Sequence, residues 1–77
     1  MFDGPMKPAY LAFVAGVDEE FASATRSGLG YRYGQVYFDM LCEVLPEAAE
    51  RLRGTSSDPF YSDEVSSMTH ELVELFF

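Results

Sequence analysis

The sequence predicts an all-α protein, a compact bundle of three to four short helices. Three observations support this fold class. Apolar residues recur at helical spacing in several stretches, no stretch sustains the alternation of a β-strand, and prolines or glycines separate the stretches. The chain has 77 residues, of which 48% are hydrophobic and 16% aromatic. We therefore expect one domain, spanning residues 1–77, with enough large side chains to fill a small core.

The first helix is expected to begin at Pro8, because proline suits the first turn of a helix, and to end before Gly28. Residues 1–6 show no helical period, so they are predicted to form a loose lead-in. Gly16 interrupts the apolar pattern, and Asp18 after it can cap a new helical turn. We therefore expect either one helix bent at Gly16 or two short helices.

The central helix is expected to run from Tyr33 to Leu45, where an unbroken apolar stripe meets Pro46. The glycines between residues 28 and 34 indicate positive φ angles or close approaches of the backbone. Cys42 lies within this apolar helix, which favours a buried thiol over a nucleophile. Pro46 also opens a third helix that ends before Gly54.

Residues 55–63 form the longest stretch without a period. Asp58 and Pro59 are typical of the start of a single helical or tight turn, which would display Phe60 and Tyr61. We expect these two rings to fold back over the core. The alternative is an exposed binding patch.

Ser62 or Asp63 is expected to cap the last helix. Its predicted buried stripe consists of Val65, Met68, Thr69, Leu72, Val73 and Phe76. His70 has acidic neighbours at Glu71 and Glu74, but the hydroxyl residues lie on the same helix without the geometry of a triad, so it is interpreted as a surface histidine. The apolar run from Leu75 to Phe77 is expected to pack on the core or on a partner.

The chain carries 13 acidic and five basic residues, a formal net charge of −8. This charge opposes direct binding of nucleic acid and favours a protein partner with a basic surface. No stretch of apolar residues is long enough to span a bilayer, no signal peptide is apparent, and the single cysteine fits a reducing compartment. We therefore expect a cytoplasmic protein that does not enter membranes.

The sequence contains no Cys/His ligand set for a metal, no catalytic triad and no phosphate-binding loop. We therefore expect no catalytic residues, no cofactor and no metal. Acidic residues and the loop aromatics are the candidates for a partner-binding surface. They are Asp18, Glu19, Glu20, Glu71, Glu74, Phe60 and Tyr61. Acidic pairs in first helical turns also compensate the helix dipole, so a merely solvated surface is the alternative.

Two segments resemble a pattern of small proteins from phages, prophages and mobile elements. Residues 32–41 (RYGQVYFDML), Pro46 and residues 53–63 (RGTSSDPFYSD) are similar to RxGQxxFNxL, P and RGTxxDPFxxD, with Asp39 in place of the usual asparagine. The match covers about half of the chain. The resemblance implies a bacterial or phage accessory protein that is helical and non-catalytic. It also implies one folding unit made of Arg32, Gln35, Arg53, Asp58, Pro59 and Phe60.

Arg32 and Gln35 lie at the start of the central helix, where free N–H groups can hold an anion or a carbonyl group. The alternative is structural, with Arg32 paired to a carboxylate and Gln35 capping its own helix. We expect Arg32 or Arg53 to bridge to Asp58 and tie the turn after it to the central helix, so these four residues form a structural junction.

Together these features predict a small acidic accessory protein that binds and modulates or inhibits a host protein, as an anti-defence protein does. One alternative is a structural or self-associating homodimer formed through the last helix. A second is a mimic of nucleic acid, because ordered carboxylates can imitate a phosphate backbone. A third is a small-ligand binder that uses Arg32 and Gln35.

Overall fold

The computed structural model describes residues 7–77, and within them it contains four α-helices and no β-strand. The helices are α1 (Pro8–Arg26), α2 (Tyr33–Val44), α3 (Pro46–Leu52) and α4 (Ser67–Glu74). The all-α prediction is therefore confirmed. The predicted lead-in, residues 1–6, lies outside the described residues.

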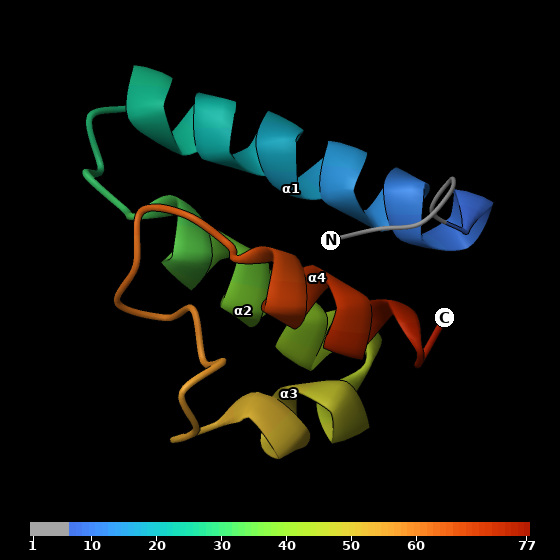
Figure 1. Cartoon of the computed structure of the whole chain (residues 1–77). Coiled ribbons are helices and arrows are strands. Elements are labelled where there is room, and N and C mark those ends of the chain that lie inside the picture. Colours follow the sequence, from blue (N-terminus) through green and yellow to red (C-terminus); the bar gives the residue numbers. More distant parts are fainter. Residues whose placement is uncertain (1–6) are drawn as a thin grey trace.

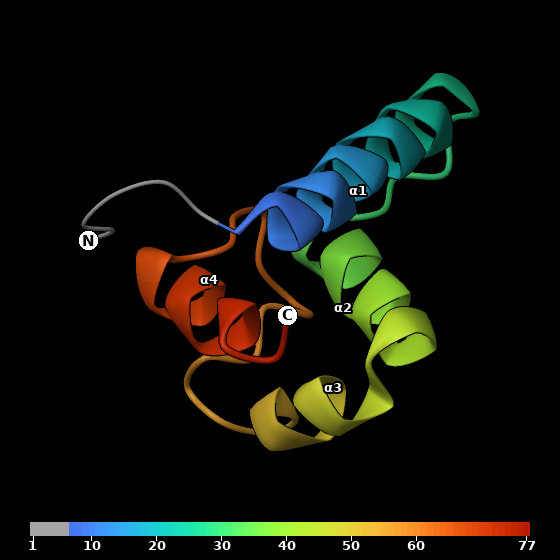
Figure 2. The ribbon, with the colours of Figure 1, turned by 90° about the vertical axis from the view of Figure 1, so that its right-hand side faces the viewer.

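The helices surround one core (Figures 1 and 2). The long helix α1 packs against α2, and α3 turns away from the end of α2 to form the base of the molecule. In Figure 2, α4 lies on the side opposite α2, between α1 and α3. The last helix thereby closes the bundle.

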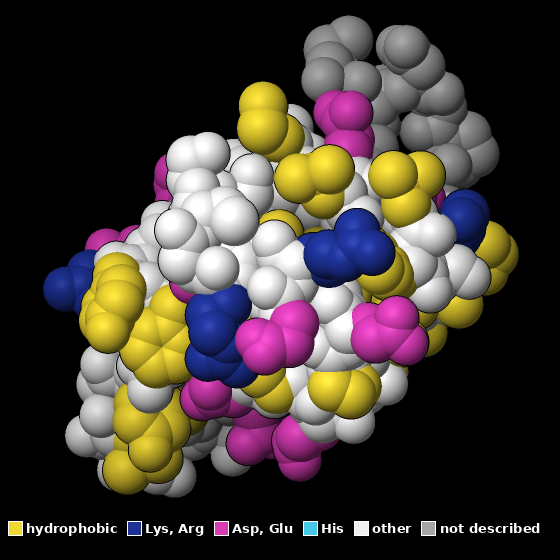
Figure 3. All heavy atoms as spheres, turned by 90° about the horizontal axis from the view of Figure 1, so that it is seen from below, with side chains coloured by type: hydrophobic (Ala, Val, Ile, Leu, Met, Phe, Trp, Pro, Cys, Tyr) yellow, Lys and Arg dark blue, Asp and Glu magenta, His cyan; other side chains and the backbone are white. Residues whose placement is uncertain are grey.

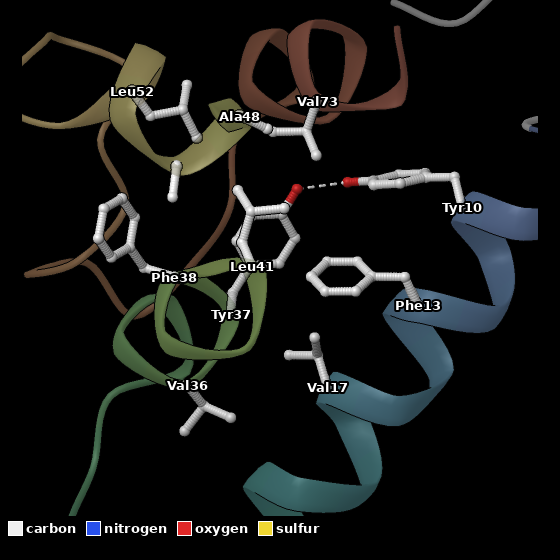
Figure 4. Packing of buried hydrophobic residues seen from close by; sticks show 11 residues of the cluster. Tyr10, Phe13, Val17, Val36, Tyr37, Phe38, Leu41, Ala48, Leu52 and Val73 are labelled. Atoms are coloured by element: carbon white, nitrogen blue, oxygen red, sulfur yellow. Dashed lines mark hydrogen bonds between the residues drawn. The ribbon is translucent and has the colours of Figure 1, made fainter. Parts of the chain in front are cut away.

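The core is built mainly from aromatic and branched side chains of α1 and α2 (Figure 4). Tyr10, Val17, Tyr37, Leu41 and Val73 are almost completely inaccessible to solvent. The other buried hydrophobic residues are Phe13, Ala24, Val36, Phe38, Ala48, Ala49 and Leu52. Large rings thus provide much of the burial that a small domain needs.

α1 is a single helix that continues through Gly16, so the alternative of two short helices is wrong. A Cβ atom at Gly16 would lie 3.5 Å from the terminal methyl group of Met40, an ordinary contact between α1 and α2. Asp18 does not cap a helix. It lies in the middle of α1 and accepts a hydrogen bond of 2.5 Å from the hydroxyl group of Tyr33. Compensation of a helix dipole therefore does not explain the acidic run at residues 18–20.

The central helix begins at Tyr33 as predicted and ends one residue earlier than expected, with Leu45 as its C-cap. Both predicted roles of the nearby glycines are confirmed. Gly28 has a φ angle of 73°, which lets the chain leave α1. Gly34 lies where α2 meets the backbone of the 59–62 turn, and its N–H donates to the carbonyl oxygen of Ser62 at 2.9 Å. Cys42 is half-buried against the core.

α4 begins later than predicted, because Ser66 rather than Ser62 or Asp63 is its N-cap. The Ser66 hydroxyl oxygen accepts a hydrogen bond from the backbone N–H of Thr69. The carbonyl oxygen of Ser62 accepts the hydrogen bond from the Gly34 N–H of α2. The Ser62 hydroxyl oxygen accepts a hydrogen bond from the backbone N–H of Glu64, within the turn that precedes α4.

The predicted buried stripe of α4 is only partly correct. Thr69 and Val73 are buried, whereas Met68, Leu72 and Phe76 are 63%, 41% and 37% exposed. α4 has eight residues, and its buried positions are Thr69 and Val73, four apart, so the buried stripe is narrower than predicted. Val65, also assigned to this stripe, precedes the helix and is half-buried.

Candidate functional site

A groove of about 290 Å³ lies between α1 and α2, next to the turn that joins them. Its walls come from the second half of α1, the 27–31 turn and one face of α2. The lining residues are Glu20, Ser23, Ala24, Ser27, Leu29, Tyr31, Val36, Asp39, Met40 and Glu43. They combine an apolar floor with an acidic rim.

The floor is formed where α1 and α2 pack together. Ala24 and Val36 are buried, and Met40 is half-buried beside them. Leu29 and Tyr31 stand at the end of the groove, 55% and 46% exposed. Two large apolar side chains are thus presented to solvent next to an apolar floor, an arrangement typical of binding surfaces.

The rim carries three carboxylates and no Lys, Arg or His side chain. Glu20 comes from α1, whereas Asp39 and Glu43 are one helical turn apart on α2. Like charges at this spacing repel each other. Partial burial, and then the neighbouring charge of Glu43, raise the pKa of the Asp39 carboxyl group. The rim therefore holds negative charge that no lining side chain neutralises.

The predicted acidic residues are divided between α1 and α4. Of the acidic run on α1, only Glu20 lines the groove. Glu71 and Glu74 lie on α4, and the Glu74 carboxylate accepts a 2.5 Å hydrogen bond from the backbone N–H of Lys7. The groove therefore uses one of the predicted acidic residues.

The groove residues that the sequence did not predict include Leu29, Tyr31, Asp39 and Glu43. One signal was available for the two acidic residues, because their spacing of four places both on one face of the central helix. The predicted turn offered no comparable signal for its two apolar residues.

The loop aromatics separate into one packed and one exposed ring. Phe60 is half-buried and meets Phe38 edge to face, with the ring centroids 5.9 Å apart. Tyr61 is 83% exposed, and the centroid of its ring lies 4.9 Å from the centroid of the Phe60 ring. Packing on the core is therefore confirmed for Phe60 and wrong for Tyr61.

The predicted bridge from an arginine to Asp58 is wrong. The Asp58 carboxylate instead accepts hydrogen bonds from the backbone N–H groups of Gly54, at 2.9 Å, and Phe60, at 3.0 Å. These bonds hold the turn that follows α3. A carboxylate this close in sequence to unpaired N–H groups is engaged by them before a distant arginine can reach it.

The two arginines of the predicted junction have other partners. Arg32 forms an exposed ion pair of 3.4 Å with Asp63. Arg53 pairs with Glu50 at 3.0 Å, and its guanidinium carbon lies 5.2 Å from the centroid of the Phe38 ring. Gln35 lies half-buried in the first turn of α2, and its backbone N–H donates to the carbonyl oxygen of Arg32. The 59–62 turn is joined to the start of α2 by the backbone hydrogen bond from Gly34 to Ser62 and not by an ion pair at Asp58.

His70 is not a surface histidine, since its side chain joins a buried chain of hydrogen bonds. Its Nδ1 atom lies 2.6 Å from the hydroxyl oxygen of Tyr10. That oxygen is 2.6 Å from the hydroxyl oxygen of Tyr37 (Figure 4). Both hydroxyl hydrogens have an acceptor when Tyr37 donates to Tyr10 and Tyr10 donates to Nδ1. Burial lowers the pKa of His70 and raises that of Tyr10 to about 12. The neutral forms are thus favoured, and the cluster acts as a structural tie between α1, α2 and α4.

A second groove, of about 380 Å³, lies between α3 and the end of α4. It is lined by Ala48, Arg51, Leu52, Leu72, Val73, Leu75 and Phe76. Figure 3 shows the α3 side of the molecule, where hydrophobic side chains are interspersed with acidic and basic ones. The apolar residues from Leu75 to Phe77 differ in their surroundings. Phe77 packs against the rings of Tyr10 and Phe13, whereas Leu75 is 75% exposed.

The chain matches no family model, no curated protein and no solved structure. Among residues 7–77, no three or more His, Cys, Asp or Glu side chains come together as metal ligands. In the same part of the chain, none of the helices has the length and apolar character needed to cross a bilayer. A functional interpretation therefore rests on the surface features of the molecule.

Proposed function

We propose that this protein is a small non-catalytic accessory factor that binds a host protein with a basic surface and modulates or inhibits it. The main support is the groove between α1 and α2, where an apolar floor is bordered by Glu20, Asp39 and Glu43 with no cation among the lining residues. The resemblance of residues 32–41 and 53–63 to phage and mobile-element proteins suggests a bacterial cytoplasm as the setting.

The two parts of the groove have complementary physical roles. Burial of the floor and of the Leu29 and Tyr31 side chains supplies affinity, because association gains most from apolar surface removed from water. The acidic rim and the net charge of −8 attract basic surfaces and accelerate their encounter. The same charges disfavour direct binding of nucleic acid.

A capture experiment with charge-neutralised variants tests this proposal. The triple variant Glu20→Gln, Asp39→Asn, Glu43→Gln removes the acidic rim with little change in side-chain shape. The matched control neutralises three exposed carboxylates outside the groove, at Glu19, Glu47 and Glu64. Wild type and control should retain the same protein from a bacterial lysate, whereas the rim variant and raised salt should release it. Equal retention by the rim variant would refute a rim-dependent partner.

The same experiment separates an ordinary partner from the target of a nucleic-acid mimic. If the rim imitates phosphates, the captured protein binds nucleic acid by itself, and added DNA or RNA should displace it from the groove in proportion to concentration. A partner that nucleic acid does not displace would exclude mimicry.

Self-association is a second candidate function, favoured by the groove between α3 and α4. Leu72, Leu75 and Phe76 are all exposed there although they are large and apolar. A symmetric dimer would cover these side chains. Light scattering distinguishes the two candidates, because a dimer that Leu75→Ser converts to a folded monomer supports self-association. A protein that stays monomeric at every concentration would exclude self-association.

A further inference from the structure

We infer that the groove between α1 and α2 receives an α-helix of the partner, with one aliphatic side chain on the floor and Lys or Arg side chains against the rim. This inference rests on the proposed function and specifies the partner segment. The shape, charge and exposed residues of the groove each support it.

The shape of the groove suits side chains of another protein better than a free small molecule. Its volume of about 290 Å³ lies at the lower limit of pockets that enclose drug-sized ligands, which is roughly 300 Å³. Two packed helices form its walls, and a third helix can lay one row of side chains between them. The groove thus accommodates a few side chains from a rigid segment.

The charges specify the chemistry of that segment. Glu20 belongs to one wall, and Asp39 and Glu43 belong to the other, so an occupant between the walls meets carboxylates on both sides. A helix can present an aliphatic residue with cations three or four positions before and after it on the same face. A second copy of this chain would oppose its own net charge of −8, and nucleic acid would be repelled.

The end of the groove supplies the anchors. Leu29 and Tyr31 are 55% and 46% exposed in the 27–31 turn, directly beside the apolar floor. A helix seated on the floor would cover both side chains at one of its ends. Aromatic and aliphatic residues that become desolvated in this way dominate the affinity of many interfaces.

A defined peptide tests the inference without knowledge of the natural partner. The probe is a 14-residue amphipathic helix of about equal Leu and Lys content. Two matched peptides replace every Lys with Glu or every Leu with Ser. NMR spectra of the ¹⁵N-labelled protein should show shifts for Ala24, Leu29, Val36 and Met40 with the Leu/Lys peptide, and fluorescence anisotropy measures its affinity. Neither matched peptide should bind comparably.

Variants of the protein make the location testable. The variant Glu20→Gln, Asp39→Asn, Glu43→Gln should weaken binding of the Leu/Lys peptide by roughly tenfold, because each exposed ion pair adds a modest amount. Leu29→Ser should weaken binding severalfold, whereas the same change at Leu75, an exposed leucine of the other groove, should leave it unchanged.

Three outcomes would overturn the inference. They are shifts centred on α3 and α4, tight binding of the peptide that lacks Leu, and equal binding by the rim variant. If the lysate partner still depends on the rim while the Leu/Lys peptide fails to bind, the proposed function stands and the helical occupant is wrong. If the peptide binds as described but no lysate protein depends on the rim, the groove binds basic helices and the proposed host target is wrong.

Discussion

Replacing Gly34 with alanine tests how the 59–62 turn is fastened to α2. A Cβ atom at this position would lie 1.8 Å from the carbonyl oxygen of Pro59 and 2.5 Å from that of Ser62. Ordinary contact begins at 3.4 Å, so the turn would have to move. The atoms of the turn that would clash belong to the backbone, which cannot rotate away as the end of a flexible side chain can.

The magnitude follows from three contributions. Overpacking costs about 1–3 kcal/mol, and weakening of the hydrogen bond from the Gly34 N–H to Ser62 costs about 1 kcal/mol. The better helix propensity of alanine returns about 1 kcal/mol. We therefore expect Gly34→Ala to lower the free energy of unfolding by about 1–3 kcal/mol and the Tm by roughly 5–20 °C.

Gly16→Ala is the matched control, because this glycine is also helical but its Cβ would make only an ordinary 3.5 Å contact with Met40. This change should raise the stability by about 0.5–1 kcal/mol. Urea unfolding followed by circular dichroism measures both variants. A Gly34→Ala protein as stable as the wild type would refute the close packing of the 59–62 turn on α2.

Three further substitutions, two of them paired with a control substitution, test other contacts. His70→Gln should lower stability near neutral pH, and its difference from wild type should shrink as the pH falls below about 6, as urea unfolding would show. The reason is that burial lowers the pKa of His70 in the folded state, so its contribution is present above the unfolded pKa and is lost on acidification. Asp58→Ala should cost about 1–2 kcal/mol in the same assay, because two backbone N–H groups lose their acceptor, whereas Arg32→Ala should cost well under 1 kcal/mol. Phe77→Ala should lower the Tm by removing two ring contacts, at a cost of about 1–3 kcal/mol, and Leu75→Ser should stay within about 0.5 kcal/mol of wild type.

Each of these expectations has a contrary result. If the stability difference between His70→Gln and wild type did not change with pH, the pKa of His70 would not differ between the folded and unfolded states. If Asp58→Ala and Arg32→Ala lowered the stability equally, the backbone hydrogen bonds to Asp58 would not contribute more than an exposed ion pair. A Phe77→Ala protein with an unchanged Tm would mean that its ring adds nothing to the core.

The sequence alone predicted the features that depend on residues close together in the chain. The central helix from Tyr33 was predicted to within one residue, because its period and the following Pro46 are local signals. The role of Gly34 was also predicted as one of two possibilities. The identity of the backbone that approaches it was not, since the 59–62 turn lies far along the chain.

Side-chain partners were predicted poorly because they depend on which elements meet. His70 appeared exposed when only its own helix was considered, yet it is half-buried and forms a hydrogen bond with Tyr10 of α1. Asp58 has two backbone partners within four residues, which a search for distant arginines overlooks. The groove likewise combines Glu20 with Asp39 and Glu43 only after α1 and α2 have packed.

The contact between Tyr10 and His70 has a consequence for folding kinetics. Sixty residues separate them in the chain, whereas α2 and α3 are joined by a single residue. Contacts between neighbours form early, while distant ones must first overcome the entropy of closing a long loop. We expect α1, α2 and α3 to assemble first and α4 to dock last. Amides of α4 should accordingly exchange with solvent through partial opening, while those of α2 require global unfolding.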